Sequence, residues 1–99
     1  MLWYHWVMGE WQQRYGALNS RCRRTLRRIR ETPTQSDIRW QDVVALLEAL
    51  GATVTGRKGS VFRVSGIGNK RMILHRPHPG DQCAKGLIDK VRIYLEDIS

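Results

Sequence analysis

The clearest pattern in the chain is a pair of apolar stripes with helical spacing, one on each side of a region of short β-branched runs. Val43, Leu46, Leu47 and Leu50 recur every three or four residues, and Gly51 follows where a glycine commonly ends a helix. From about residue 82 onward, a second stripe predicts a closing amphipathic helix: Leu87, Ile88, Val91, Leu95 and Ile98.

Three short runs between these helices favour strands: Ala52–Thr55, Val61–Val64 and Arg71–His75. The turns Gly56–Gly59 and Gly66–Asn69 separate them, which is typical of a meander of antiparallel hairpins. The order helix, strand, strand, strand, helix predicts an α+β domain. In it, both helices cover one face of a three-stranded antiparallel sheet and the other face stays open.

The middle strand sets which residues enter the core. Successive side chains of a strand point to opposite faces, so Phe62 and Val64 share one face while Val61 and Arg63 share the other. We assign the first pair to the core and Arg63 to the open face. The residues expected to be buried together are Phe62, Val64, Leu46, Leu47, Leu50, Leu87, Val91 and Leu95.

Residues 19–35 predict a basic amphipathic helix followed by a linker. Cys22, Leu26 and Ile29 recur at i, i+4 and i+7, Asn19 or Ser20 can cap the start, and Pro33 ends the helix. Arginines occupy its other faces. Two interpretations stay open for them, a row of phosphate contacts or a solvated face: Arg21, Arg23, Arg24, Arg27, Arg28 and Arg30.

Residues 1–18 differ from the rest in their aromatic content and are interpreted as an extension outside the compact domain, residues 36–99. An aromatic clamp that stacks nucleic-acid bases is the alternative. The apolar run from Leu2 to Met8 is too short for a membrane span and lacks the basic start of a signal peptide. The aromatic residues are Trp3, Tyr4, Trp6, Trp11 and Tyr15.

Charge and cysteine content narrow the function. Seventeen Lys and Arg face nine Asp and Glu, which gives a net charge of +8 and favours a polyanionic partner, nucleic acid or an acidic protein. The two cysteines, Cys22 and Cys83, form neither a disulfide framework nor a zinc motif, so we expect reduced thiols in a cytoplasmic protein.

Four short motifs follow one another in the compact domain: Leu50-Gly51 at a helix end, Gly59-Ser60 at a turn, Pro77-His78-Pro79 after the third strand, and Lys85-Gly86 in the last helical segment. In this order they resemble the HicA toxins of bacterial type II toxin–antitoxin systems. The resemblance covers about residues 38–98, in the stretches IRWQDVVALLEALGATVTGRKGSVFRV and RMILHRPHPGDQCAKGLIDKVRIYLEDI. Residues 19–32 are similar to the lead-in of one branch of that family.

That resemblance implies a fold similar to a double-stranded RNA-binding domain and a ribosome-independent endoribonuclease that cuts mRNA. It also implies a HicB-like antitoxin partner and chemistry without a metal or cofactor. An imidazole, whose ordinary pKa is about 6.5, can take the proton of a ribose 2′-hydroxyl at neutral pH. The hydroxyl then attacks the adjacent phosphate, which restricts the reaction to RNA.

One position departs from the family pattern. The catalytic histidine of the family follows the Gly-Ser turn, and this chain has Val61 and Phe62 there. Three interpretations follow: an RNA-binding domain that does not cut, a catalytic role taken over by His75 or His78, or the use of another group.

The segment around Arg76 holds the candidate catalytic residues. His75 and His78 either form an acid–base pair beside an arginine that binds phosphate, or Pro77 and Pro79 shape the connection while His78 hydrogen-bonds it in place. A solvated turn is the alternative for Arg57 and Lys58, and a solvated side chain is the alternative for Lys85. The candidate RNA-binding residues are Arg57, Lys58, Ser60, Arg63, Arg76 and Lys85.

The sequence therefore predicts an RNA-directed toxin that cleaves mRNA. The alternatives are a non-catalytic RNA-binding module derived from such a toxin, and a subunit whose basic face binds an acidic antitoxin.

Overall fold

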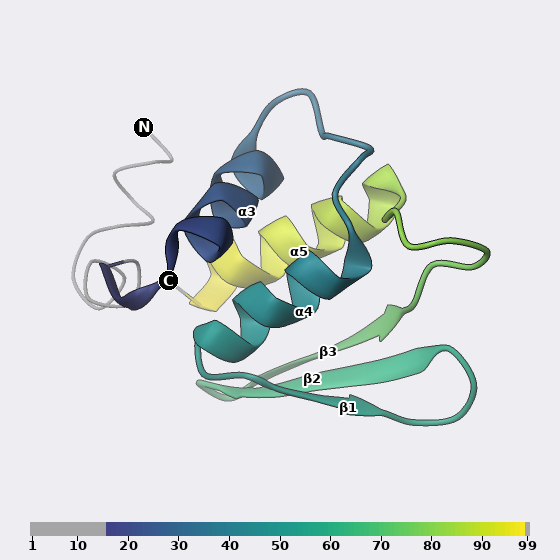
Figure 1. Cartoon of the computed structure of the whole chain (residues 1–99). Coiled ribbons are helices and arrows are strands. Elements are labelled where there is room, and N and C mark those ends of the chain that lie inside the picture. Colours follow the sequence, from purple (N-terminus) through teal and green to yellow (C-terminus); the bar gives the residue numbers. More distant parts are fainter. Residues whose placement is uncertain (1–15, 99) are drawn as a thin grey trace.

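The computed structural model describes residues 16–98 and has an α+β architecture, as the hydrophobic pattern predicts (Figure 1). Three antiparallel strands form one sheet in the order β1-β2-β3. Helices α4 and α5 lie on one face of it. The elements are α3 (Ser20–Arg30), α4 (Trp40–Ala49), β1 (Thr53–Gly56), β2 (Val61–Ile67), β3 (Lys70–His75) and α5 (Lys85–Ile98).

The core lies between the sheet and the two helices. Val64 is fully buried and pairs with Met72, so the predicted orientation of the middle strand is confirmed. Phe62 and Leu87 are only partly buried. Phe62 lies near the start of β2, and its ring packs on Trp40 at a centroid distance of 5.2 Å. The fully buried residues opposite the sheet are Val43, Leu46, Leu47, Ile88, Val91 and Leu95.

Strand β2 is longer than its sequence pattern indicates. It runs through an irregularity between Val64 and Ile67, and Ile67 is buried. Gly66 makes this possible: its φ is +98°, and a Cβ atom there would lie 3.3 Å from the carbonyl oxygen of Gly51. A residue expected in a turn is therefore part of the strand.

Helix α3 forms a further layer, packed on α4 and α5 on the side away from the sheet (Figure 1). Asn19 is its N-cap, because the Asn19 side chain accepts a hydrogen bond of 2.8 Å from the Cys22 amide. The predicted stripe of Cys22, Leu26 and Ile29 is buried. The helix ends at Arg30, before Pro33. This segment is thus an integral part of the core.

Arg92 of α5 ties α3 and the linker after it to the last helix. Its Nε donates to the Ile29 carbonyl at 2.9 Å, and its Nη2 donates to Thr34 Oγ1 at 2.8 Å. The Thr34 hydroxyl in turn donates to Asp89 Oδ1 at 2.6 Å. The Ile29 carbonyl, in the last turn of α3, thereby gains a charged donor.

Residues 1–15, which make up most of the predicted extension, lie outside the described residues. Leu18, at the end of that segment, is 2% exposed and belongs to the core. Among residues 16–98, no helix is both long and apolar enough to span a membrane.

Candidate nucleic-acid interface

The β1–β2 turn and the β3–α5 connection meet at one end of the sheet, on the right in Figure 1. They are joined by a hydrogen bond of 2.8 Å from the Arg76 amide to the Ser60 carbonyl. A hollow between them is lined by Ser60, Arg76 and His78, together with Gly59, Pro77 and Gly80. The fold therefore brings together three of the side chains selected from the sequence.

A second hollow lies between the same connection and α5. His75 and His78 both line it, with Gly86 from the first turn of α5 and Lys90 one turn further along. The Lys90 amine donates a hydrogen bond of 2.6 Å to the Ile73 carbonyl, which holds α5 to the edge strand β3. Pro77 and His78 border both hollows. Arg76 also lines a hollow on the helix side of the sheet, with Trp40 and Phe62.

His75 lies directly opposite Val61 in the ladder between β2 and β3. The neighbouring pair, Ser60 and Arg76, shares the backbone hydrogen bond, so Val61 and His75 form a non-hydrogen-bonded pair. Side chains of such pairs lie on the same face, with Cβ atoms about 4.5–5.5 Å apart. The imidazole of His75 is thus a neighbour of the position at which the family resemblance places its catalytic histidine.

Arg63 lies on the open face of the sheet, away from both hollows. It lines a third depression with Arg57, Val61 and Arg71. Arg71 was not among the residues expected to bind RNA, although the alternation in β3 places it on this face: Met72 and Leu74 are buried, so Arg71 and Ile73 point the other way.

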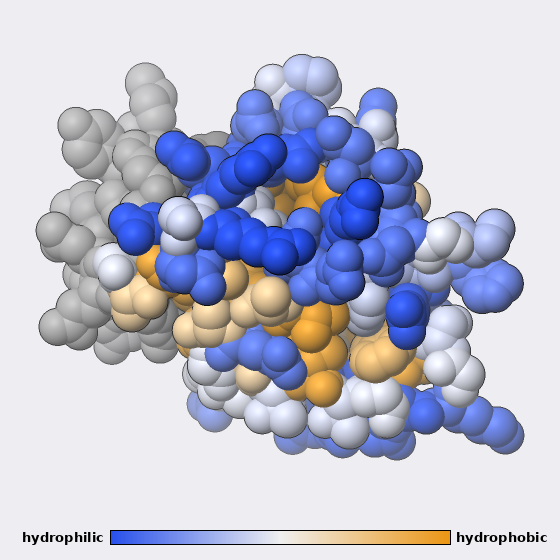
Figure 2. All heavy atoms as spheres, viewed as in Figure 1, coloured by the Kyte–Doolittle hydropathy of each residue, from blue (hydrophilic) through white to orange (hydrophobic). Residues whose placement is uncertain are grey.

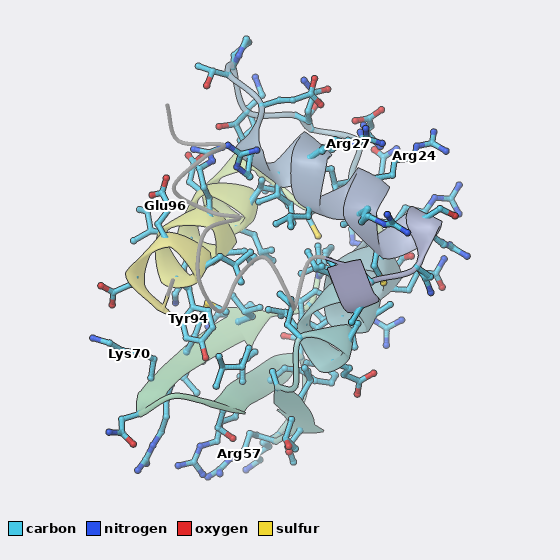
Figure 3. All side chains as sticks on the ribbon, turned by 90° about the vertical axis from the view of Figure 1, so that its left-hand side faces the viewer. Arg24, Arg27, Arg57, Lys70, Tyr94 and Glu96 are labelled. Atoms are coloured by element: carbon cyan, nitrogen blue, oxygen red, sulfur yellow. The ribbon has the colours of Figure 1, made fainter. Side chains whose placement is uncertain are left out.

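This part of the chain is strongly positive. Residues 49–80 contain no Asp or Glu. Of their Lys and Arg residues, Lys70 forms an ion pair, with Asp97 of α5 at 3.0 Å. Arg57 lies at the sheet side of the molecule in Figure 3. The basic residues of this surface are Arg57, Lys58, Arg63, Arg71 and Arg76, and Lys70 is left out because Asp97 neutralises it at the other end of β3. Such a surface attracts phosphate groups by long-range Coulomb forces and by guanidinium hydrogen bonds.

The remaining predicted residues are exposed at the periphery. Lys58 lies in the β1–β2 turn, and Lys85 is the first residue of α5. His78 is also exposed and makes no hydrogen bond within residues 16–98, so the expectation that it hydrogen-bonds the connection in place is wrong. Backbone contacts fix the connection instead: the Trp40 amide donates to Asp81 at 2.7 Å and the Cys83 amide to Ile38 at 2.8 Å.

The two cysteines lie within the core. Burial raises the pKa of the Cys83 thiol to about 12, and the nearby carboxylates of Asp81 and Asp42 act in the same direction. Burial, followed by the charge of Asp42, also raises the pKa of Cys22, although Arg21 opposes this. Both stay as thiols at neutral pH, which argues against a nucleophilic role. Within the described residues, no three His, Cys, Asp or Glu side chains group as metal ligands.

The order α4-β1-β2-β3-α5, with one covered and one open sheet face, defines a small basic α+β domain of the double-stranded RNA-binding-domain type. The model of the HicA toxin family of bacterial toxin–antitoxin systems matches residues 40–98, and the chain belongs to this family. The family expectation drawn from the sequence is therefore confirmed. Neither a curated protein nor a solved structure matches the chain.

Family membership identifies the chain as the toxin of a toxin–antitoxin system and implies, in general, an antitoxin partner of the HicB type. Helix α3 precedes the matched segment, so it is an addition to the part of the chain that the family model describes.

Proposed function

We propose that this toxin binds RNA at the end of the sheet and cleaves mRNA there, with His75 as the general base. The observation that carries this proposal is the pairing of His75 with Val61 on one face of the ladder. An imidazole at position 75 can reach much of the space that an imidazole at position 61 would reach, because the two side chains are cross-strand neighbours.

In the proposed reaction, a nitrogen of His75 accepts the proton of a ribose 2′-hydroxyl. The 2′-oxygen then bonds to the adjacent phosphorus while the bond from phosphorus to the 5′-oxygen breaks, leaving a 2′,3′-cyclic phosphate. His78, which borders the same hollow, supplies a proton to the departing 5′-oxygen. Arg76, beside Ser60 in the adjoining hollow, stabilises the negative charge that develops on the phosphate.

The basic residues of this region hold the RNA backbone. Arg57, Lys58 and Ser60 belong to the β1–β2 turn, Arg63 to the open face, and Lys85 to the start of α5. In this proposal they contribute binding energy and orientation, because phosphate contacts position a nucleic acid without reading its sequence. A HicB-like protein would neutralise the toxin by covering this end of the sheet.

A second candidate function is RNA binding without cleavage. The observation that favours it is Val61 itself, since an isopropyl group cannot transfer a proton. The two functions share the same binding surface and differ in what happens to the bound RNA.

Incubating purified protein with a labelled RNA and with DNA of the same sequence separates them. The cleaving toxin cuts the RNA and leaves the DNA intact, because DNA lacks the 2′-hydroxyl. Intact RNA that is nevertheless bound would establish the non-catalytic module. If the protein bound neither nucleic acid but formed a complex with the product of a neighbouring antitoxin gene, its basic face would serve a protein partner.

A further inference from the structure

Helix α3 carries a basic surface that the proposed cleavage site does not use. Its buried side contacts α4 and α5, and its other sides carry arginines. Figure 2 shows strongly hydrophilic residues gathered over α3. A hollow along the helix is lined by Ser20, Arg21, Arg24, Thr25, Arg27 and Arg28, next to Asp42 of α4.

The arginines of α3 divide into two groups. Arg21 forms an ion pair of 2.8 Å with Asp42, and Arg28 pairs with Asp37, so a carboxylate already neutralises each of these two guanidinium groups. Arg24 and Arg27, by contrast, are exposed and have no ion-pair or hydrogen-bond partner within residues 16–98. They are three residues apart and therefore neighbours on the helix surface, and both project from α3 in Figure 3.

This concentration of charge opposes the stability of the helix. Ser20–Arg30 contains no acidic residue, and arginines repeat at three- and four-residue intervals, where like charges repel. Arg21 and Arg23 stand in the first turn, where the helix dipole disfavours cations, whereas Arg27, Arg28 and Arg30 stand in the last turn, where it favours them. A bound polyanion offsets these costs, so the charge distribution of α3 complements a row of phosphates.

We infer that Arg24 and Arg27 form a second phosphate-binding surface, which holds a distal part of the same RNA whose other part lies at the end of the sheet. This inference rests on the proposed RNA binding. The layer formed by α4 and α5 separates α3 from the sheet (Figure 1). An RNA must therefore extend around the molecule, whose longest axis is 37 Å, to occupy both surfaces. RNA is favoured over an acidic protein because one continuous ligand then explains two separate unpaired basic surfaces.

RNA length provides the test. Binding of the full chain is measured for a single-stranded RNA of about 6 nucleotides and for one of about 30, which at about 3.4 Å per stacked nucleotide exceeds the length of the molecule. The variant Arg24→Gln/Arg27→Gln removes the two free charges. The control Arg39→Gln/Lys70→Gln removes the same charge from exposed residues on α4's N-cap and at the start of β3.

The Arg24→Gln/Arg27→Gln variant should bind the short RNA like wild type and the long RNA more weakly. For the long RNA, the slope of log affinity against log salt should fall by about 1.4, or about 0.7 for each lost contact with a single strand. Equal losses in the variant and the control would overturn the inference and leave the proposed function intact. So would a variant that binds the long RNA normally but loses binding to poly-glutamate, because the partner would then be a protein. If wild type bound neither RNA, the proposed function itself would fail.

Discussion

Val61 and His75 face each other across the β2–β3 ladder as a non-hydrogen-bonded pair on the open side of the sheet. Because the side chains at positions 61 and 75 are cross-strand neighbours on one face, an imidazole at either position should be able to act as the general base. His75→Gln should lower the rate of RNA cleavage by about 10²–10⁴-fold, and Val61→His in the same chain should restore much of it. Binding of uncut DNA of the same sequence should change by only a few-fold in both variants. Wild-type cleavage in His75→Gln would show that His75 is not the base.

The Arg76 side chain should contribute a phosphate contact, because it lines the hollow at the sheet end with Ser60 and His78. Arg76→Gln should weaken RNA binding and reduce the salt slope by about 0.7. Lys70→Gln is the control, since Lys70 already pairs with Asp97 in a different part of the sheet. Titrations between about 50 and 200 mM salt measure both. If Arg76→Gln and Lys70→Gln gave the same slope of log affinity against log salt, Arg76 would not contact a phosphate.

Arg92 should matter more to stability than a surface ion pair does. Arg92→Met deletes hydrogen bonds to the Ile29 carbonyl and to Thr34 from a side chain that is only 21% exposed. We expect a loss of about 1–3 kcal/mol in the free energy of unfolding. Lys70→Met removes an ion pair whose partners are 53% and 58% exposed, and should cost less than about 1 kcal/mol. Urea unfolding of the two variants provides the comparison, and equal costs would contradict the role given to Arg92.

The N-terminal boundary of the folded domain should lie before Leu18. Its side chain is 2% exposed in the core, so a protein that starts at residue 19 loses this contact and one that starts at residue 16 keeps it. The shorter protein should be less stable by about 2–3 kcal/mol, as for other buried leucines. Its melting temperature should then be lower by roughly 8 °C or more. Identical melting curves would mean that Leu18 contributes nothing.

Stability should fall at high pH because of Cys83. The pKa of its thiol is raised from 9.0 to about 12 in the folded protein, so above pH 9 the unfolded chain loses a proton that the folded chain retains. The free energy of unfolding therefore decreases as pH rises through this interval. Burial also raises the pKa of Tyr94, which adds to the trend. Cys83→Ala should make the decline between pH 9 and about 11 shallower, and an unchanged slope would refute this assignment.

Periodicity alone predicts the α+β fold and the covered face of the sheet. The stripes that contain Val43 and Val91 have unmistakable helical spacing, and the alternation around Val64 orients the central strand. These features are local, so each can be read from a window of a few residues.

The features that the sequence does not reveal depend on contacts between distant segments. The pairing of Val61 with His75 requires the strand register, which the turns and the irregularity near Gly66 set jointly. The amphipathic pattern of α3 indicates a buried side but not which helices it meets. The direction of Arg71 follows from the alternation within β3, but its place beside Arg57 and Arg63 depends on how the strands pair.

The hydrogen bond between Arg92 and the Ile29 carbonyl joins residues 63 positions apart, near the two ends of the described chain. A ribosome makes α3 before α5, so the nascent arginine-rich helix can pack on α4 early but lacks its contacts with α5 until that helix has been made. Chains that stop before α5 lack Ile88, Val91 and Leu95, and with them one wall of the core. A chain interrupted between α3 and α5 therefore keeps an arginine-rich helix that lacks one of its two packing partners.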